Sequence, residues 1–182
     1  KDWDLELMKV HDKYEDTKKL WVNSFRIEPN MFNSPDRVGT LLAHPNEFGA
    51  YHDEFNTKKF LEYSKFFAEN NNFHIPKGEG VSGLVKKDLW DRIGGNDPRF
   101  APTSWDDMDL FLRMINEGYE FILTSKSLVW HFGARGSHRL EENSNQTSQR
   151  QRESEIKNQQ KWLNKWGSPP AFNEFGMING LR

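Results

Sequence analysis

Residues 104–124 read SWDDMDLFLRMINEGYEFILT, and this stretch sets the class of fold. Four apolar side chains recur at the i, i+3, i+4 and i+7 positions of one helical face: Met108, Phe111, Leu112 and Ile115. Gly118 follows as a C-terminal cap, and residues 120–124 have the length and composition of a strand. A helix followed directly by a strand fits an α/β domain, in which helices flank a sheet.

Three carboxylates open this helix, Asp106, Asp107 and Asp109, and their spacing allows two interpretations. In the structural one, Ser104 is the N-cap, Asp107 completes a capping box, and the helix dipole favours acids in the first turn. Asp109 and Arg113 stand four residues apart and are expected to pair. In the functional one, a carboxylate held at a helix N-terminus stays ionised and serves as general base toward a hydroxyl group.

The rest of the chain predicts further helices and strands around this centre. We expect helices over residues 3–14, 55–70 and 87–93, and strands over residues 20–27, 40–43 and 128–132. Residues 140–155 are expected as a polar loop, followed by a C-terminal helix and tail, 156–182, that docks through Trp162 and Trp166. A length of 182 residues suits a single domain, whose core would be residues 1–139.

Composition excludes several classes of protein. The net charge of -2 creates no field that would attract nucleic acid or an anionic membrane, so no nucleic-acid partner is expected. The absence of cysteine excludes disulfides, thiolate metal sites and thiol nucleophiles. No apolar stretch is long enough to span a bilayer, and no signal-peptide pattern opens the chain. A cytoplasmic protein with no transmembrane segment is therefore expected.

Three other features could carry chemistry. His131 ends an apolar segment, where a lone histidine is either a hydrogen-bonded core residue or a ligand of a divalent ion such as manganese. The glycine-rich segment 78–83 permits close approach of a substrate to the backbone, although a tight turn requires glycines equally. Asp2-Trp3-Asp4 has the form of a metal-binding Asp-x-Asp, but no strand precedes it, so we assign Trp3 to the opening helix.

Residues 80–137 read GVSGLVKKDLWDRIGGNDPRFAPTSWDDMDLFLRMINEGYEFILTSKSLVWHFGARGS. The run contains, in order, a glycine loop, a short helix ending Ile-Gly-Gly-x-Asp, an acidic pair followed by x-Asp-Leu-x-Leu-Arg, a Gly-Tyr pair and a strand ending in His. This succession resembles the second half of a family 2 inverting glycosyltransferase of the GT-A fold. The Lys-Trp-Gly at residues 165–167 is similar to the ending of many such domains.

The resemblance implies roles for individual residues. Asp107 matches the Asp of the family's Glu-Asp motif, which is the catalytic base, and Asp106 takes the Glu position. His131 matches the histidine that coordinates a divalent metal, Mn²⁺ or Mg²⁺, in many of these enzymes. The implied substrate-binding residues are Gly80, Val81, Ser82, Gly83, Trp105, Arg135, Ser137 and His138.

The resemblance also implies an activity, namely transfer of a sugar from a nucleoside diphosphate donor to an acceptor hydroxyl, on a carbohydrate or another molecule, by single displacement. The implied fold is a mixed sheet flanked by helices. The family's N-terminal nucleotide-binding half, with its own Asp-x-Asp, has no counterpart in this sequence. The chain is therefore expected to be a fragment or to need a partner that supplies those strands, and homo-oligomers are left open.

Two other functions remain open at this point. The first is a non-catalytic, truncated domain that binds carbohydrate or a partner chain through Trp105, Trp130 and Phe132. The second is a metal-dependent hydrolase whose ligands would be Asp106, Asp107, Asp109 and His131. The hydrolase requires Asp107 and Asp109 to converge, whereas two residues on a helix diverge by about 200° when they are two positions apart.

Overall fold

A computed structural model of the chain describes residues 3–14, 19–29, 40–43, 45–49, 51–76, 82–101, 104–132, 144–174 and 176–182. The chain forms two compact units. Unit 1 contains Lys1–Val85 and Glu120–Gly136, and unit 2 contains Lys86–Tyr119 and Ser137–Arg182.

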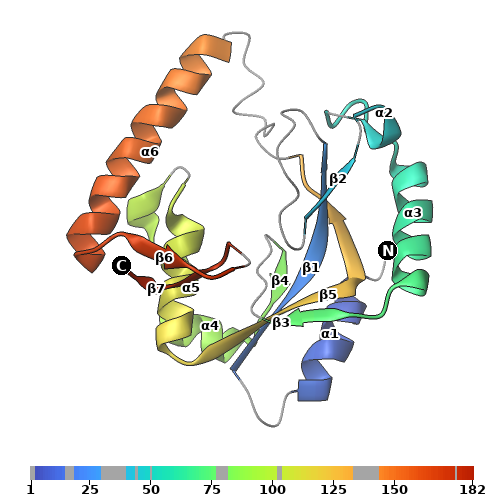
Figure 1. Cartoon of the computed structure of the whole chain (residues 1–182), viewed down its shortest axis with the longest axis horizontal. Helices are drawn as coiled ribbons and strands as arrows, with labels where there is room; N and C mark the ends of the chain where they lie inside the picture. The colour runs from blue at the N-terminus through green and yellow to red at the C-terminus, as the bar shows by residue number, and fades with distance from the viewer. Residues whose placement is uncertain are drawn as a thin grey trace. The chain divides into compact units, whose positions relative to one another are not determined.

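Unit 1 is built on a five-stranded sheet (Figure 1). Its strands are β1 (Lys19–Pro29), β2 (Thr40–Ala43), β3 (His74–Pro76), β4 (Gly83–Leu84) and β5 (Tyr119–Trp130). The order is β2-β1-β5-β3, and β4 also pairs with β1. β2 runs parallel to β1, whereas β4 is antiparallel to β1 and β3 is antiparallel to β5. The sheet is therefore mixed and flanked by helices, as predicted.

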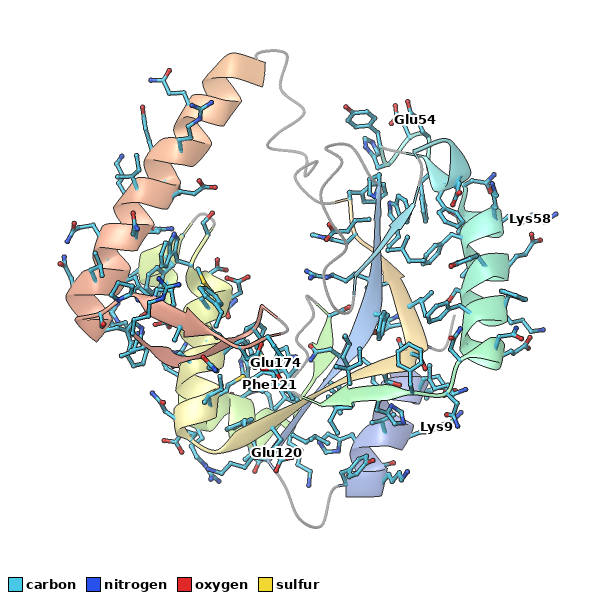
Figure 2. All side chains as sticks on the ribbon, viewed as in Figure 1. Lys9, Glu54, Lys58, Glu120, Phe121 and Glu174 are labelled. Carbon is cyan, nitrogen blue, oxygen red and sulfur yellow. The ribbon has the colours of Figure 1, made fainter. Side chains whose placement is uncertain are left out.

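The two faces of β1 pack against different helices. Toward α1 (Trp3–Tyr14), the buried cluster consists of Leu7, Val10, Leu20, Val22 and Ile122. Toward α2 (Pro45–Phe48) and α3 (Thr57–Asn70), it consists of Phe25, Ile27, Phe48, Phe60, Leu123 and Leu128. Because side chains alternate along a strand, Val22 and Phe25 point to opposite faces. Figure 2 shows Lys58 directed away from the sheet on the outer side of α3, so α3 is amphipathic.

β5 is one continuous strand, although the sequence predicted two short strands separated by polar residues. The polar residues Ser125 and Ser127 are buried within it, and each hydroxyl group has a partner. Ser127 Oγ lies 2.7 Å from Ser24 Oγ, and the Phe73 backbone N–H donates to Ser125 Oγ at 3.0 Å. These hydrogen bonds allow serine to occupy core positions. A prediction based on apolar residues alone therefore divided the strand into two.

Unit 2 consists of helices and a small hairpin. Its elements are α4 (Lys87–Ile93), the short 3₁₀ helix η1 (Pro98–Phe100), α5 (Asp106–Asn116), α6 (Ser144–Trp166), β6 (Pro170–Phe172) and β7 (Ile178–Leu181). Its buried side chains include Leu89, Phe100, Leu110, Leu112, Met114, Trp162 and Ile178. The predicted helices over 87–93 and around Met108 are confirmed, and so is docking of the C-terminal helix through Trp162.

The prediction of a polar loop at residues 140–155 was wrong for residues 144–155, which form the first half of α6. This half of the helix has no apolar stripe, so hydrophobic periodicity did not reveal it. Its composition, rich in Gln, Arg and Glu, nevertheless favours helix. The hairpin of β6 and β7 was also missed, because its strands are three and four residues long.

Candidate active site

A buried carboxylate anchors α5 in unit 2. Asp109 has no exposed surface. Its Oδ2 accepts from Arg113 Nε at 2.9 Å, and its Oδ1 accepts from Trp166 Nε1 at 2.9 Å and pairs with Lys165 Nζ at 2.6 Å. The predicted pairing with Arg113 is confirmed. Because three donors occupy the carboxylate, Asp109 is structural and does not fit the ligand set of a hydrolase.

Asp97 extends this network to the segment before α5. Lys165 Nζ also lies 2.7 Å from Asp97 Oδ2, so one ammonium group bridges two carboxylates. Arg99 donates to Asp97 through both its side chain and its backbone N–H. The hydrogen bonds from Arg99, with those from Lys165, hold the pKa of Asp97 well below its usual range. The Lys-Trp-Gly segment therefore fixes the start of α5 against η1.

Asp107 lies on the opposite side of α5 and is exposed, whereas Asp106 is half-buried. Asp107 Oδ1 accepts the backbone N–H of Met108 at 2.8 Å. The capping-box interpretation was wrong, because the N-cap is Trp105, with no side-chain cap, rather than Ser104. Ser104 has left-handed backbone geometry and does not occupy the N-cap position.

Two consecutive residues before Asp106 have strained backbone geometry. Ser104 and Trp105 have φ angles of 74° and 72°, in the left-handed region that disfavours residues with a Cβ. Each such residue costs about 1–3 kcal/mol and persists only where its surroundings enforce it. Strained residues of this kind are common at functional sites, so the Ser104–Trp105 peptide is a candidate part of such a site.

A pocket of about 570 Å³ lies over this peptide, within the usual range for a small-molecule site. From the α5 side it is lined by Trp105, Asp107 and Met108, and from α6 by Arg152, Ile156 and Gln159. An indole ring, a guanidinium, an amide and two carboxylates, those of Asp107 and Glu155, surround one hollow and suit a sugar, which presents an apolar ring face and hydroxyl groups. Of the predicted site residues, the structure brings Trp105 and Asp107 together here, next to Asp106.

His131 belongs to unit 1 and follows β5. Its backbone N–H donates to the Ile27 carbonyl at 2.9 Å, and its Nδ1 lies 2.7 Å from Glu28 Oε1. The carboxylate fixes the ring and keeps the hydrogen on Nδ1, which leaves the Nε2 lone pair for a ligand. The side chain is 36% exposed. It fits a single metal ligand, although among the described residues no group of three or more His, Asp and Glu side chains could hold a metal ion.

The other predicted substrate-binding residues lie in or near β4, or outside the described residues. Gly83 pairs with Asn23 of β1, and a Cβ at this position would lie 2.2 Å from Trp21 Nε1. Packing of the Trp21 indole therefore requires glycine there. The Ser82 carbonyl accepts the Ser24 N–H at 3.1 Å, and Ser82 Oγ is buried with no hydrogen-bond partner among the described residues. Outside the described residues lie Gly80, Val81, Arg135, Ser137 and His138.

Of the three aromatic residues proposed for carbohydrate binding, two pack against other rings in unit 1 and one lines the pocket of unit 2. The Trp130 ring centroid lies 5.3 Å from that of Phe55, and the Phe132 centroid lies 5.5 Å from that of Phe55. Trp130 and Phe132 are thus part of the aromatic cluster of unit 1. Trp105 lines the pocket of unit 2.

Sequence reasoning missed the contribution of α6 to the site. Arg152 and Gln159 line the pocket, and Asn158 contacts the segment beneath it. One signal was present, because Asn158 precedes Trp162 by one helical turn and so shares its buried face. The sequence also did not reveal Glu28 as the carboxylate partner of His131, because the two residues are brought together by strand pairing.

Comparisons with known proteins give little further information. No protein-family model matches the chain, and no solved structure matches it. A 61-residue segment is 36% identical to an uncharacterized protein of Mycobacterium bovis and to two of Mycobacterium tuberculosis. This segment is 32% of the chain. The chain spans about a quarter (23%) of the length of each relative. Among the described helices, none is long and apolar enough to cross a membrane.

Proposed function

We propose that this chain carries the acceptor side of a GT-A glycosyltransferase site, with Asp107 as the catalytic base. One observation carries the proposal: the Asp107 carboxylate is exposed on the first turn of α5 and lines a pocket of about 570 Å³ together with Trp105. The order of motifs between residues 80 and 137 supports the same assignment. The buried, saturated Asp109 adds to it, because it fixes the helix that presents Asp107.

The proposed reaction is a single displacement. The acceptor sugar lies against Trp105 and directs one hydroxyl toward Asp107. As the hydroxyl oxygen forms a bond to the anomeric carbon of the donor, its proton passes to Asp107 and the bond to the diphosphate breaks. The bonding electrons leave with the diphosphate, and the anomeric configuration inverts. Asp106, half-buried and next to the base in the chain, takes the Glu position of the motif.

The donor side of the site is part of the same proposal. His131 is the residue that would hold Mn²⁺ or Mg²⁺, with its ring fixed by Glu28. The metal ion would supply positive charge that stabilises the leaving diphosphate. The resemblance assigns substrate binding to Gly80, Val81, Ser82, Gly83, Arg135, Ser137 and His138. Strands that bind the nucleotide would come from outside this sequence.

A second candidate is a non-catalytic carbohydrate-binding domain. The presence of Trp105 in the pocket favours it as well, because stacking on a sugar ring needs no base. The two candidates differ in their need for Asp107. A binding domain has no use for a nucleoside diphosphate or a divalent ion, whereas a transferase requires both.

The test is a transfer assay on the full chain with Mn²⁺, a panel of nucleoside diphosphate sugars and a panel of glycoside acceptors. Asp107→Asn should lower the transfer rate by about 10²–10⁴-fold, the usual contribution of a general base. Asp106→Asn should cause a smaller loss, and Asn164→Asp, an exposed change on α6, should cause none. Transfer by Asp107→Asn at the unmodified rate would refute the assignment of the base. Saccharide binding that Asp107→Asn leaves unchanged, with no transfer even when a chain carrying the nucleotide-binding strands is added, would favour the binding domain.

A further inference from the structure

The strained Ser104–Trp105 peptide directly precedes the two acids and forms one wall of the pocket. Left to itself, this segment would relax to negative φ, because both residues carry a Cβ. Relaxation would turn the Trp105 ring and the first turn of α5 to new directions. The geometry of the pocket therefore depends on whatever holds this peptide in place.

The side chain of Asn158, from α6, holds it from below. Its Nδ2 donates to the Ser104 carbonyl at 2.9 Å and to the Phe100 carbonyl at 2.7 Å. These two bonds join both ends of the segment that runs from η1 to the strained pair. Asn158 is only 1% exposed, so water does not compete for them.

The orientation of this amide follows from its neighbours. Lys161 Nζ donates to Asn158 Oδ1 at 2.8 Å, so the oxygen must face the ammonium group. The NH₂ group then faces the two carbonyls, and the reversed amide would place oxygen against oxygen. Lys161 Nζ also donates to the Arg99 carbonyl at 2.5 Å, which ties the same side chain to η1.

Trp162, one turn further along α6, holds the ring of Trp105. The two ring centroids lie 5.6 Å apart at an interplanar angle of 52°. Trp162 is fully buried, and its Nε1 donates to the Ser168 carbonyl at 2.9 Å, so its own ring is fixed. The buried side of α6 therefore fixes both the backbone and the side chain of Trp105.

We propose that Asn158 is the positioning residue of this site: by clamping the carbonyls of Phe100 and Ser104 it holds the left-handed pair that aims Trp105 and Asp107 at an acceptor sugar. This assignment rests on the proposed function. Asn158 is buried and does not line the pocket, so it acts through Trp105 and Asp107. It also gives α6 a role in the reaction beyond lining the pocket.

The test compares Asn158→Asp with Asn164→Asp on the full chain. Asn158→Asp keeps the acceptor for Lys161 but replaces both donors with a carboxylate, whereas Asn164→Asp makes the same change at an exposed position of α6. With far-UV circular dichroism retained, Asn158→Asp should shift the Trp105 indole resonance and speed amide exchange at residues 109–111, whose N–H groups close the first turns of α5. It should also lower the transfer rate by about 10²-fold, as expected when reacting groups are misplaced. Asn164→Asp should change none of these.

A second variant covers the case in which Asn158→Asp unfolds. Glycine adopts positive φ without strain, so Ser104→Gly should reduce the need for the clamp. The double variant Ser104→Gly/Asn158→Asp should recover the Trp105 resonance and slow exchange at residues 109–111. An unshifted resonance in Asn158→Asp, or no recovery in the double variant, would overturn the proposal. These readouts need no donor sugar, so they decide the role of Asn158 even if the unmodified chain transfers no sugar.

Discussion

Asp107 and Asp109 stand two positions apart on α5, and their environments give them different tasks. Asp109 is buried with Arg113, Lys165 and Trp166 around it, whereas Asp107 is exposed at the pocket. A carboxylate with saturated hydrogen bonds contributes to stability, and an exposed one that lines a pocket can be contacted by a ligand. Their sequence neighbours do not distinguish them, but the 200° or so between their directions on the helix does.

This difference predicts opposite outcomes for the same substitution. Asp109→Asn should lower the free energy of unfolding by about 3–5 kcal/mol, because it removes a fully buried carboxylate that pairs with Arg113 and is one of the two carboxylates bound by Lys165. Asp107→Asn should lower it by about 1 kcal/mol or less, the contribution of an acid to the helix dipole. Urea denaturation followed by circular dichroism measures both values. Equal losses would contradict the division of tasks.

Gly83 is required by the packing of Trp21, which predicts the effect of adding a methyl group. Gly83→Ala places a Cβ 2.2 Å from Trp21 Nε1 and should lower the free energy of unfolding by about 1–3 kcal/mol, as overpacking does. Gly180→Ala is the matched control, because no atom lies within 4 Å of the added Cβ. Denaturation curves for the two variants would coincide if the close approach of Trp21 were unimportant.

Helix α6 is joined to η1 and α5 by charges, which predicts how acid affects stability. The pKa of Asp97 is lowered by Arg99 and Lys165, so the folded protein binds a proton there less readily than the unfolded chain. The stabilising contribution of Asp97 is therefore complete above about pH 5 and is lost progressively as pH falls below that. Asp97→Asn should reduce stability most at neutral pH, and its difference from the unmodified chain should shrink toward pH 2. Denaturation at several pH values measures this difference, and a constant gap would contradict it.

The elements that were predictable from sequence are those with a regular apolar pattern. The helix α5 follows from Met108, Phe111, Leu112 and Ile115, and β1 follows from its run of β-branched and aromatic residues. The first half of α6 carries no such pattern, and β5 is interrupted by buried serines. The sequence predictions for both elements were wrong. Helix propensity defines the first half of α6 and hydrogen bonds to the buried serines support β5, whereas the predictions relied on apolar periodicity.

The buried clusters described for unit 1 consist of residues of that unit, which predicts that damage to them is local. Phe60 is 8% exposed in the core of unit 1, so Phe60→Ala should cost about 3–5 kcal/mol. Amide exchange should accelerate along β1, while amides near Met114 and Trp162 in unit 2 stay protected. Mass-spectrometric hydrogen exchange separates the two units. Equal acceleration in both would show that they open together.

The candidate site was predictable only in part. Its acids and Trp105 could be found, because the acidic run at the start of a helix is visible in the sequence. The wall formed by α6 could not, because Asn158 and Gln159 lie some 50 residues away in a segment without apolar periodicity. The left-handed pair also gave no signal, since neither Ser104 nor Trp105 is a residue that favours positive φ.

A sugar titration followed by nuclear magnetic resonance tests the central claim most directly. Methyl glycosides of common hexoses would be added to the full chain while the amides of every residue and the tryptophan indoles are observed. The proposed site predicts shifts at residues 104–108 and 155–159, with the Trp105 indole among them, and none along β1. Shifts confined to other residues, or no shifts at the highest saccharide concentration, would contradict a sugar-binding pocket at Asp107.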